Sequence, residues 1–308
     1  MMGTPKLSTS MPIKYIKPVS KLLLTLLACI MVKQFCYKKT DGFALYKVLS
    51  TLPYNPAWEV TAQHTHGLDD ALSQPFHYLA KGAQSYVFQS EDGKYVIKFF
   101  RLYHLRPPVW LTALNFPLPL QTYKLGKMIE KWDELDKDFQ SYRIAYEEMK
   151  EETGLLYLHL NKTSHLKKTL TLYDKIGVVY HLDLDRMEFL VQKRADLVYP
   201  AIDALAKREG AEAAKEAITS LVNLLVSRSE KGIFDKDPDL NTNFGFIGTT
   251  PVQIDIGRFR RQTAARDPEE KRNEIIRITD NFRQWLDANH PSLSEHLLGE
   301  IQKIPVSA

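Results

Sequence analysis

The segment GIFDKDPDLNTNFGFIGTTPVQIDIG (residues 232–257) carries the strongest pattern in the chain. A short apolar run leads to three aspartates, Asp235, Asp237 and Asp239, and Asn243 follows immediately before a strand-like stretch. A second strand-like stretch ends at Asp255. A loop rich in Asp, Asn and Pro is by itself an ordinary solvated turn. What these polar residues do therefore depends on the elements that precede them.

A three-strand β meander is predicted upstream, over residues 76–100. Apolar and polar residues alternate, Gly82 interrupts the pattern, and an Asp-Gly turn separates the second strand from the third. On the third strand, Lys98 shares a face with Val96 and Phe100. A lysine on an apolar face is costly unless its charge finds a partner. Lys98 is therefore a candidate functional residue, the alternative being a side chain that reaches solvent at an edge.

The rest of the chain changes from strands to helices. Four prolines in residues 101–122 exclude a long helix there, and residues 101–125 are interpreted as an insertion. A helix is predicted over about 125–152 from an apolar stripe at 4-3-4-3 spacing: Leu135, Phe139, Tyr142, Tyr146 and Met149. Four strand-like stretches follow, then a strongly helical region over 201–228 and a helical C-terminus. This order predicts an α+β protein with two lobes.

Taken together, these features resemble the protein-kinase-like superfamily. The stretch AKGAQSYV, residues 80–87, fits the register of its glycine-rich loop, G-x-G-x-x-G-x-V, with Gly82 as the middle glycine. Val-Ile-Lys, ending at Lys98, looks like the family's V-A-I-K. Asp-Lys-Asp at 235–237 stands where the family has His-Arg-Asp, and Asp-Ile-Gly at 255–257 resembles Asp-Phe-Gly.

The resemblance covers roughly residues 76–290 and implies a fold. This is a bilobal protein-kinase-like fold with a β-rich N-lobe over residues 76–193, which includes the insertion, and a mainly helical, shortened C-lobe over residues 194–308. It also implies ATP and Mg²⁺ as cofactors, and a protein or small-molecule hydroxyl acceptor that the sequence does not identify.

The family's site residues are carried over position by position. Lys98 would hold phosphates as a catalytic residue, a helix glutamate, for which Glu147 is chosen, would orient it, and Asp237 would serve the attacking hydroxyl. Asn243 and Asp255 would hold Mg²⁺, which prefers carboxylate and amide oxygens. The remaining nucleotide contacts are expected from Gly82, Ser85, Val87 and Gln192, the last in a hinge that bonds adenine through its backbone.

Several departures from the family pattern leave alternatives open. Asp237 lies six residues before Asn243, one more than the family spacing, so Asp235 and Asp239 are rival bases. No Ala-Pro-Glu follows Asp255, which argues against a standard platform for protein substrates. The chain resembles the atypical or small-molecule branches, or a pseudokinase that acts as a membrane-associated binding or scaffold module.

The N-terminal region predicts membrane association. Residues 1–40 are interpreted as a hydrophobic leader or membrane anchor, with a membrane contact through residues 21–36. The apolar run 22–32 is short for a transmembrane helix but fits the core of a signal peptide. The alternatives are an exported protein, a lipoprotein modified at Cys29, and a translation start at Met11 in place of Met1. Residues 41–75 are predicted to be a connecting extension.

Composition excludes several classes of protein. With 44% hydrophobic residues, the chain is not intrinsically disordered. The formal charge of +4 comes from the lysines of residues 1–47, and the remainder is slightly acidic, so nucleic-acid binding is not expected. The two cysteines, Cys29 and Cys36, both lie in the leader. The body therefore has no disulfide framework, no cysteine-ligated zinc site and no thiol nucleophile.

Overall fold

A seven-stranded sheet forms the first lobe of the computed structural model, which describes residues 13–61, 67–102, 118–262 and 267–305. The strand order is β4-β7-β3-β2-β1-β5-β6, and every neighbouring pair is antiparallel except β1 and β5. The predicted meander is confirmed as β1, β2 and β3. The strands are β1 (Phe76–Lys81), β2 (Ser85–Ser90), β3 (Tyr95–Phe100), β4 (Leu155–His159), β5 (Thr169–Tyr173), β6 (Val179–Asp183) and β7 (Phe189–Lys193).

The two faces of this sheet have different roles because side chains alternate along each strand. On one face Tyr86, Phe88, Ile97 and Phe99 are fully buried in the core of the lobe. The opposite face of β3 carries Lys98. This alternation is what turns the lysine away from the core and toward the second lobe.

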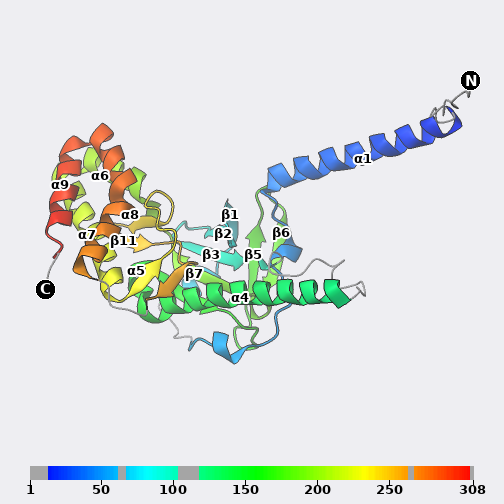
Figure 1. Cartoon of the computed structure of the whole chain (residues 1–308), viewed down its shortest axis with the longest axis horizontal. Helices are drawn as coiled ribbons and strands as arrows, with labels where there is room; N and C mark the ends of the chain where they lie inside the picture. The colour runs from blue at the N-terminus through cyan, green and yellow to red at the C-terminus, as the bar shows by residue number, and fades with distance from the viewer. Residues whose placement is uncertain (1–12, 62–66, 103–117, 263–266, 306–308) are drawn as a thin grey trace, which may run out of the picture.

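Helix α4 (Leu118–Glu148) crosses the sheet and connects the lobes (Figure 1), and the short α5 (Lys150–Thr153) follows it. The predicted stripe is buried in a second core, where the Tyr142 ring lies 4.7 Å from the ring of Phe100 on β3. The helix begins at Leu118, earlier than predicted. Pro119 lies in its first turn, where the missing N–H has no intrahelical partner to lose, so proline is tolerated there.

The second lobe is mainly helical. It contains α6 (Val198–Arg208), α7 (Ala211–Glu230), α8 (Pro268–Asn289) and α9 (Pro291–Gln302), which lie together at the left of Figure 1. The region predicted as helical over 201–228 is divided because Gly210 has φ +94°. Two small sheets complete the lobe: β8 (Asp196–Leu197) with β10 (Phe244–Ile247) and β11 (Thr250–Gln253), and β9 (Ile233–Asp235) with β12 (Phe259–Arg261). The α+β fold class with two lobes is confirmed.

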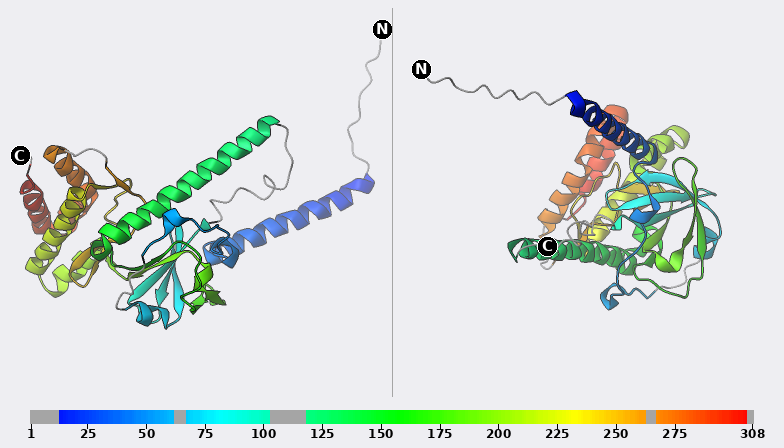
Figure 2. Two further views of the ribbon diagram at one scale, coloured as in Figure 1. Left: turned by 90° about the horizontal axis from the view of Figure 1, so that it is seen from below. Right: turned by 90° about the vertical axis from the view of Figure 1, so that its right-hand side faces the viewer.

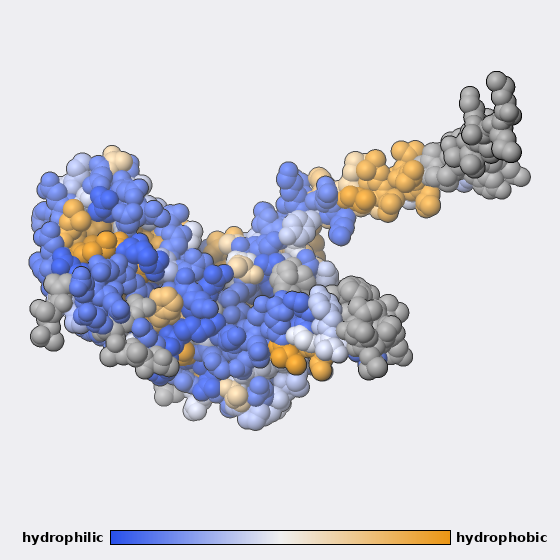
Figure 3. Space-filling view, in the orientation of Figure 1, coloured by the Kyte–Doolittle hydropathy of each residue, from blue (hydrophilic) through white to orange (hydrophobic). Residues whose placement is uncertain are grey.

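Helix α1 (Ile13–Thr40) projects away from both lobes (Figures 1 and 2). Apolar side chains cover its middle portion, as the orange band of Figure 3 shows. Gly42, with φ +72°, ends the helix, and its N–H donates to Tyr37 O at 2.8 Å. Within the described part of the chain, no helix combines the length and the apolar character that a membrane span needs.

The extension after α1 packs against the first lobe. Its short helices are η1 (Leu45–Lys47), η2 (Pro56–Trp58) and α2 (Leu68–Leu72), and a further turn, η4 (Leu184–Arg186), precedes β7. Phe43 is buried against β2 and β6. The indole of Trp58 is buried and donates to Asp136 on α4 at 2.9 Å. The extension thereby fixes the sheet to α4 as well as linking α1 to the sheet.

Candidate active site

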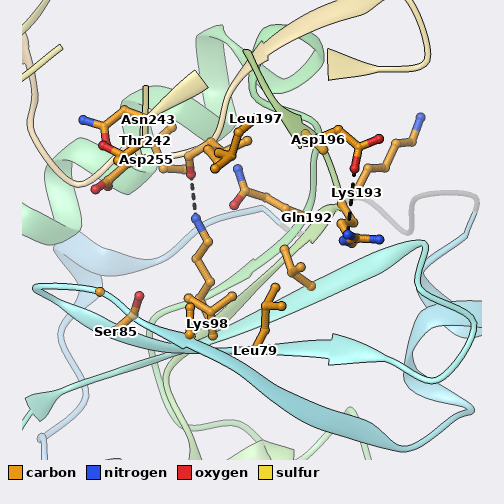
Figure 4. Close-up of a pocket in the computed structure, with 18 of the residues that line it drawn as sticks. Leu79, Ser85, Lys98, Gln192, Lys193, Asp196, Leu197, Thr242, Asn243 and Asp255 are labelled. Atoms are coloured by element: carbon orange, nitrogen blue, oxygen red, sulfur yellow. Dashed lines mark hydrogen bonds and ion pairs between the residues drawn. The ribbon is translucent and has the colours of Figure 1, made fainter. Parts of the chain in front are cut away.

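A cavity of about 850 Å³ lies between the two lobes (Figure 4). The first lobe contributes β1, β2, β3 and the end of β7, and the second lobe contributes the start of α6 and the segments around Asn243 and Asp255. The cavity has an apolar part and a polar part. Leu79, Val87 and Val96 line it from the sheet, and Leu197 and Ile254 line it from the second lobe. A concave site with a few convergent polar groups is the usual form of a small-molecule site.

Lys98 extends from β3 across the cavity to the second lobe. Its ammonium group donates a hydrogen bond to Ile254 O at 2.6 Å. Burial lowers the pKa of Lys98, and the carboxylate of Asp255 opposes that effect by raising it. The sequence predicted that Lys98 would place a charge on an apolar face of the sheet. In the structure this charge lies at the junction of the lobes, near the carboxylate of Asp255.

Asn243 and Asp255 are held side by side by the backbone. Asn243 O accepts from the N–H groups of Ile254 (2.8 Å) and Asp255 (3.3 Å). The Asn243 carboxamide donates to Asp237 O at 2.6 Å, and one carboxylate oxygen of Asp255 accepts from the N–H of Gly257 at 3.3 Å. The two side chains therefore present oxygen atoms to the same end of the cavity, near Lys98 (Figure 4).

The three rival aspartates have different surroundings. Asp235 is only 2% exposed, and burial raises its pKa. It accepts hydrogen bonds from Gln253 and from the N–H of Asp237 (3.0 Å), and Arg228 lies at 4.0 Å. These contacts make Asp235 part of the framework that supports the loop.

Asp237 and Asp239 lie at the surface of that loop. Asp237 is exposed and forms an ion pair with Arg258 at 3.1 Å. Asp239 accepts from the N–H of Asn241 (3.0 Å) and from the hydroxyl of Thr242 (2.8 Å). Both aspartates line a smaller polar pocket that also includes Asn243, Asp255 and Arg258. An acceptor hydroxyl that entered this pocket would meet Asp237 or Asp239 next to the predicted metal-binding residues.

The structure does not bring Glu147 to Lys98. Glu147 is on an exposed side of α4, where it forms an ion pair with Arg143 at 2.9 Å. The α4 residue that lines the cavity is Tyr142, whose hydroxyl donates to Gln84 Oε1 at 2.9 Å. Burial raises the pKa of Tyr142, and the Asp255 carboxylate raises it further. Tyr142 belongs to the predicted apolar stripe. Its position in the 4-3-4-3 spacing predicts a core tyrosine and does not indicate that it also lines the cavity.

The turn between β1 and β2 covers one side of the cavity. Gly82 and Ser85 close it through a hydrogen bond from Gly82 N to Ser85 O at 2.9 Å, and Val87 follows on β2. The guanidinium group of Arg101 donates to Gly82 O (2.9 Å) and to Ala83 O (2.8 Å). This ordering of the turn by Arg101 has no signal in the sequence pattern.

Gln84, in the same turn, lies next to Gly257 of the second lobe. A Cβ atom at Gly257 would lie 1.8 Å from Gln84 Oε1 and 3.0 Å from the Tyr142 hydroxyl. A side chain at position 257 would therefore displace the Gln84 carboxamide from this position. Together with the bond to Tyr142, this contact joins the turn to both α4 and the second lobe.

Gln192 is the last buried residue of β7 before the connection to the second lobe. It pairs with Val96 on β3 and is 1% exposed. Its Nε2 donates to Thr153 O at 2.8 Å, whereas its Oε1 has no hydrogen-bond partner within the described residues. In Figure 4 the carboxamide lies between Lys98 and the connecting segment 193–197.

The fold can now be compared with those of solved structures. One similar structure is that of the bifunctional kinase-methyltransferase WbdD. The sequence identity is 16% and the TM-score is 0.36, and the match covers 75% of this chain and 48% of WbdD. The ROP18 kinase domain, solved with AMP-PNP and sucrose, is 14% identical over 61% of this chain and 52% of its own, with a TM-score of 0.34. Rv3197 of Mycobacterium tuberculosis, solved with erythromycin, is 14% identical. The match covers 93% of this chain and 75% of Rv3197, with a TM-score of 0.34.

These similarities are distant, and no family model and no curated protein matches the sequence. The chain spans about half the length of WbdD and of the ROP18 domain. In this chain a lysine on the third strand is followed by a long helix, a connection through β7, and then the Asn243 and Asp255 segments at the lobe junction. The described residues form an α+β fold with two lobes and a cavity between them, which is the arrangement that the sequence predicted.

Proposed function

We propose that this chain binds Mg·ATP between its lobes and transfers the γ-phosphoryl group to a hydroxyl acceptor. The observation that carries the proposal is the convergence of Lys98, Asn243 and Asp255 on one end of a cavity whose other part is apolar. A nucleoside triphosphate has the same division into a flat apolar base and a charged chain of phosphates. Its phosphates would meet the lysine, and its base would lie between Val87 and Ile254.

The oxygen atoms of Asn243 and Asp255 fit Mg²⁺. This ion is commonly held by one or two carboxylates together with substrate phosphates and waters, so two protein ligands are sufficient. When bound, it would neutralise charge on the phosphates. No cluster of three or more His, Cys, Asp or Glu side chains that could hold a metal occurs among the residues the structure describes.

The reaction requires little covalent chemistry from the protein, since phosphoryl transfer is catalysed mainly by positioning and charge stabilisation. Lys98 would orient the phosphates from the sheet, and the turn held by Arg101 would cover them. Asp237 would accept or orient the proton of the acceptor hydroxyl, with Asp239 as its rival in the same pocket.

The decisive variant is Lys98→Met, and Lys94→Met, at an exposed lysine in the turn before β3, is its control. Transfer or hydrolysis of the γ-phosphoryl group by the purified chain is measured with labelled ATP. We expect Lys98→Met to lower the rate at least 100-fold and the control to leave it unchanged. An unchanged rate in a folded Lys98→Met protein would contradict the proposal.

A pseudokinase is the second candidate, and two contacts favour it. Arg258 pairs with Asp237, the residue predicted to serve the nucleophile, and Glu147 does not reach Lys98. In this alternative the chain binds a nucleotide and uses the same fold as a scaffold. Nucleotide binding without turnover, in both the wild type and Arg258→Ala, would favour the scaffold over the enzyme.

We also propose that α1 associates with a lipid membrane through residues 21–36. Leu22, Leu24 and Leu27 are more than half exposed, and the apolar surface continues around the helix between Lys21 and Lys33. Leucine side chains exposed on all sides of a helix have no partner in water, and a bilayer would bury them. Sedimentation with anionic vesicles tests this contact: changing these three leucines to serine should abolish it, and unchanged binding would refute it.

A further inference from the structure

We propose that lysines around the base of α1 bind the headgroups of anionic phospholipids and hold the first lobe against the membrane surface. This inference rests on the proposed membrane contact of α1, and it adds the class of lipid and a second contact in the folded lobe. The surface concerned, here called the lysine collar, consists of three lysines of α1 and two of the first lobe: Lys33, Lys38, Lys39, Lys81 and Lys175.

Hydrogen bonds between α1 and the first lobe hold the collar together. Lys81, at the end of β1, donates to the Tyr37 hydroxyl at 2.7 Å, and its ammonium group lies 4.9 Å from the centre of the Tyr37 ring. Lys175, in the turn between β5 and β6, donates to Asp41 at 2.7 Å, and Asp41 also accepts from the Tyr78 hydroxyl at 3.0 Å. The last turns of α1 therefore share one surface with the end of β1 and the turn after β5.

The collar is positively charged and accessible from solvent. All three of its α1 lysines are exposed, Lys81 is partly exposed, and the Lys175 side chain is 44% exposed. The ion pair with Asp41 offsets one of the five positive charges. Charges of one sign that gather on one surface repel one another and attract a surface of opposite charge. An anionic membrane has such a surface, and it attracts lysines that lie next to a membrane-bound helix.

The collar also lies at the right level along α1. Figure 3 shows hydrophilic residues between the orange band of α1 and the first lobe. Lys33 directly follows the apolar run 22–32, and Tyr37, which holds Lys81, is about 6 Å further along the helix. Attraction to lipid headgroups acts over a Debye length, about 8 Å at physiological ionic strength. When the apolar band contacts a bilayer, the collar therefore lies within reach of the headgroups.

The turn between β5 and β6 adds an apolar contact to the same surface. Ile176, next to Lys175, is 57% exposed, and Val178 is 44% exposed. Apolar side chains flanked by lysines suit the boundary between headgroups and acyl chains. A neutral membrane offers these apolar contacts without the attraction between charges, so the collar should make binding depend on the charge of the lipid.

The experiment compares vesicles of phosphatidylcholine with vesicles that also contain about 30% phosphatidylserine. Partition coefficients of the full chain are measured by sedimentation, and we expect the wild type to prefer the anionic vesicles at least about 10-fold. Lys81→Gln/Lys175→Gln should bind the anionic vesicles about 10- to 30-fold more weakly and the neutral ones almost unchanged. Lys207→Gln/Lys303→Gln is the control, because these lysines lie in the second lobe and also pair with acidic residues. It should behave as the wild type does.

A second collar variant, Lys38→Gln/Lys39→Gln, removes two exposed charges of α1 and leaves the lobe unchanged, so the test does not depend on the folding of the first variant. It should show a loss of similar size. Equal binding of the wild type to both kinds of vesicle, or collar variants that bind as the control does, would overturn the role of the collar and leave the α1 contact intact. The lysines would then face solvent or an acidic protein. Failure of the folded wild type to bind either kind of vesicle would overturn the α1 contact and this inference together.

Discussion

Gln253 connects two buried charges beneath the candidate active site, and replacing it should destabilise the protein strongly. It is fully buried, accepts from Arg228 at 2.7 Å and donates to Asp235. Gln253→Leu removes these two hydrogen bonds, each of which involves a charged group and contributes about 1.5–3 kcal/mol, and also a longer one from Gln253 Nε2 to Asp255 O at 3.3 Å. Burial of the leucine offsets about 1.5–3 kcal/mol of this loss. From the midpoints of these ranges, the net decrease in the free energy of unfolding should be about 2 kcal/mol.

Urea denaturation at pH 7, followed by circular dichroism, measures this change. Gln284→Leu is a matched control, because Gln284 is exposed on α8 and its side chain donates to Asp280 in the same helix at 2.8 Å. The control should change the free energy of unfolding by less than about 0.5 kcal/mol. If Gln253→Leu cost no more than the control, the Arg228–Gln253–Asp235 network would not stabilise the loop, and this reasoning would be wrong.

Two further predictions concern groups around the turn and α4. Burial raises the pKa of Asp138 to about 6. Between about pH 4 and pH 6 the folded state therefore keeps a proton that the unfolded state releases, and the free energy of unfolding falls as the pH rises through this range. The melting temperature of Asp138→Asn minus that of the wild type should therefore increase from pH 4.5 to pH 7.5; a constant difference would refute the shift. Arg101→Met should weaken nucleotide binding about 3- to 10-fold, since the turn would lose two hydrogen bonds that order it. Arg186→Met, at an exposed arginine, should have no effect on the same calorimetric titration, and equal affinities for all three proteins would contradict the role of the turn.

The sequence predicted the strands of the first lobe well because their signals are local. The alternation over residues 76–100 and the Asp-Gly turn depend only on neighbouring residues, and the position of Lys98 on the cavity face follows from the same period of two. The division of the helical region at Gly210 was missed because the residues on both sides favour helix. The positive φ of that glycine, which follows the last cap residue of α6, separates α6 from α7.

The site was predictable where it lies within short motifs and not where distant segments meet. Asn243 and Asp255 were predicted as a pair from their spacing, and the structure places them side by side through backbone hydrogen bonds. Glu147 was chosen from its place beside an apolar stripe, but the rotation of α4 presents Tyr142 to the cavity. Helix rotation depends on packing between Phe100, Phe139 and the second lobe, which no local pattern encodes.

The buried support of the loop was likewise not visible in the sequence. In the sequence, nothing distinguishes the three aspartates at positions 235, 237 and 239. In the structure, Asp235 is buried and the other two are not. Arg228 on α7 and Gln253 on β11 reach Asp235 from different elements. Distinguishing a framework aspartate from a candidate base therefore required the tertiary contacts.

The most direct test of the central claim is a thermal melt of the full chain with ATP, in the presence and absence of Mg²⁺. At about 100 times its dissociation constant, a ligand stabilises the folded state by about 2.7 kcal/mol, which corresponds to a rise of several degrees in a protein of this size. We predict that this rise requires Mg²⁺, that Asp255→Ala abolishes it, and that Asp196→Ala, in the same cavity but on β8, retains it. No rise at millimolar ATP, or a rise that survives in Asp255→Ala, would contradict the assignment of Asp255 and the nucleotide site.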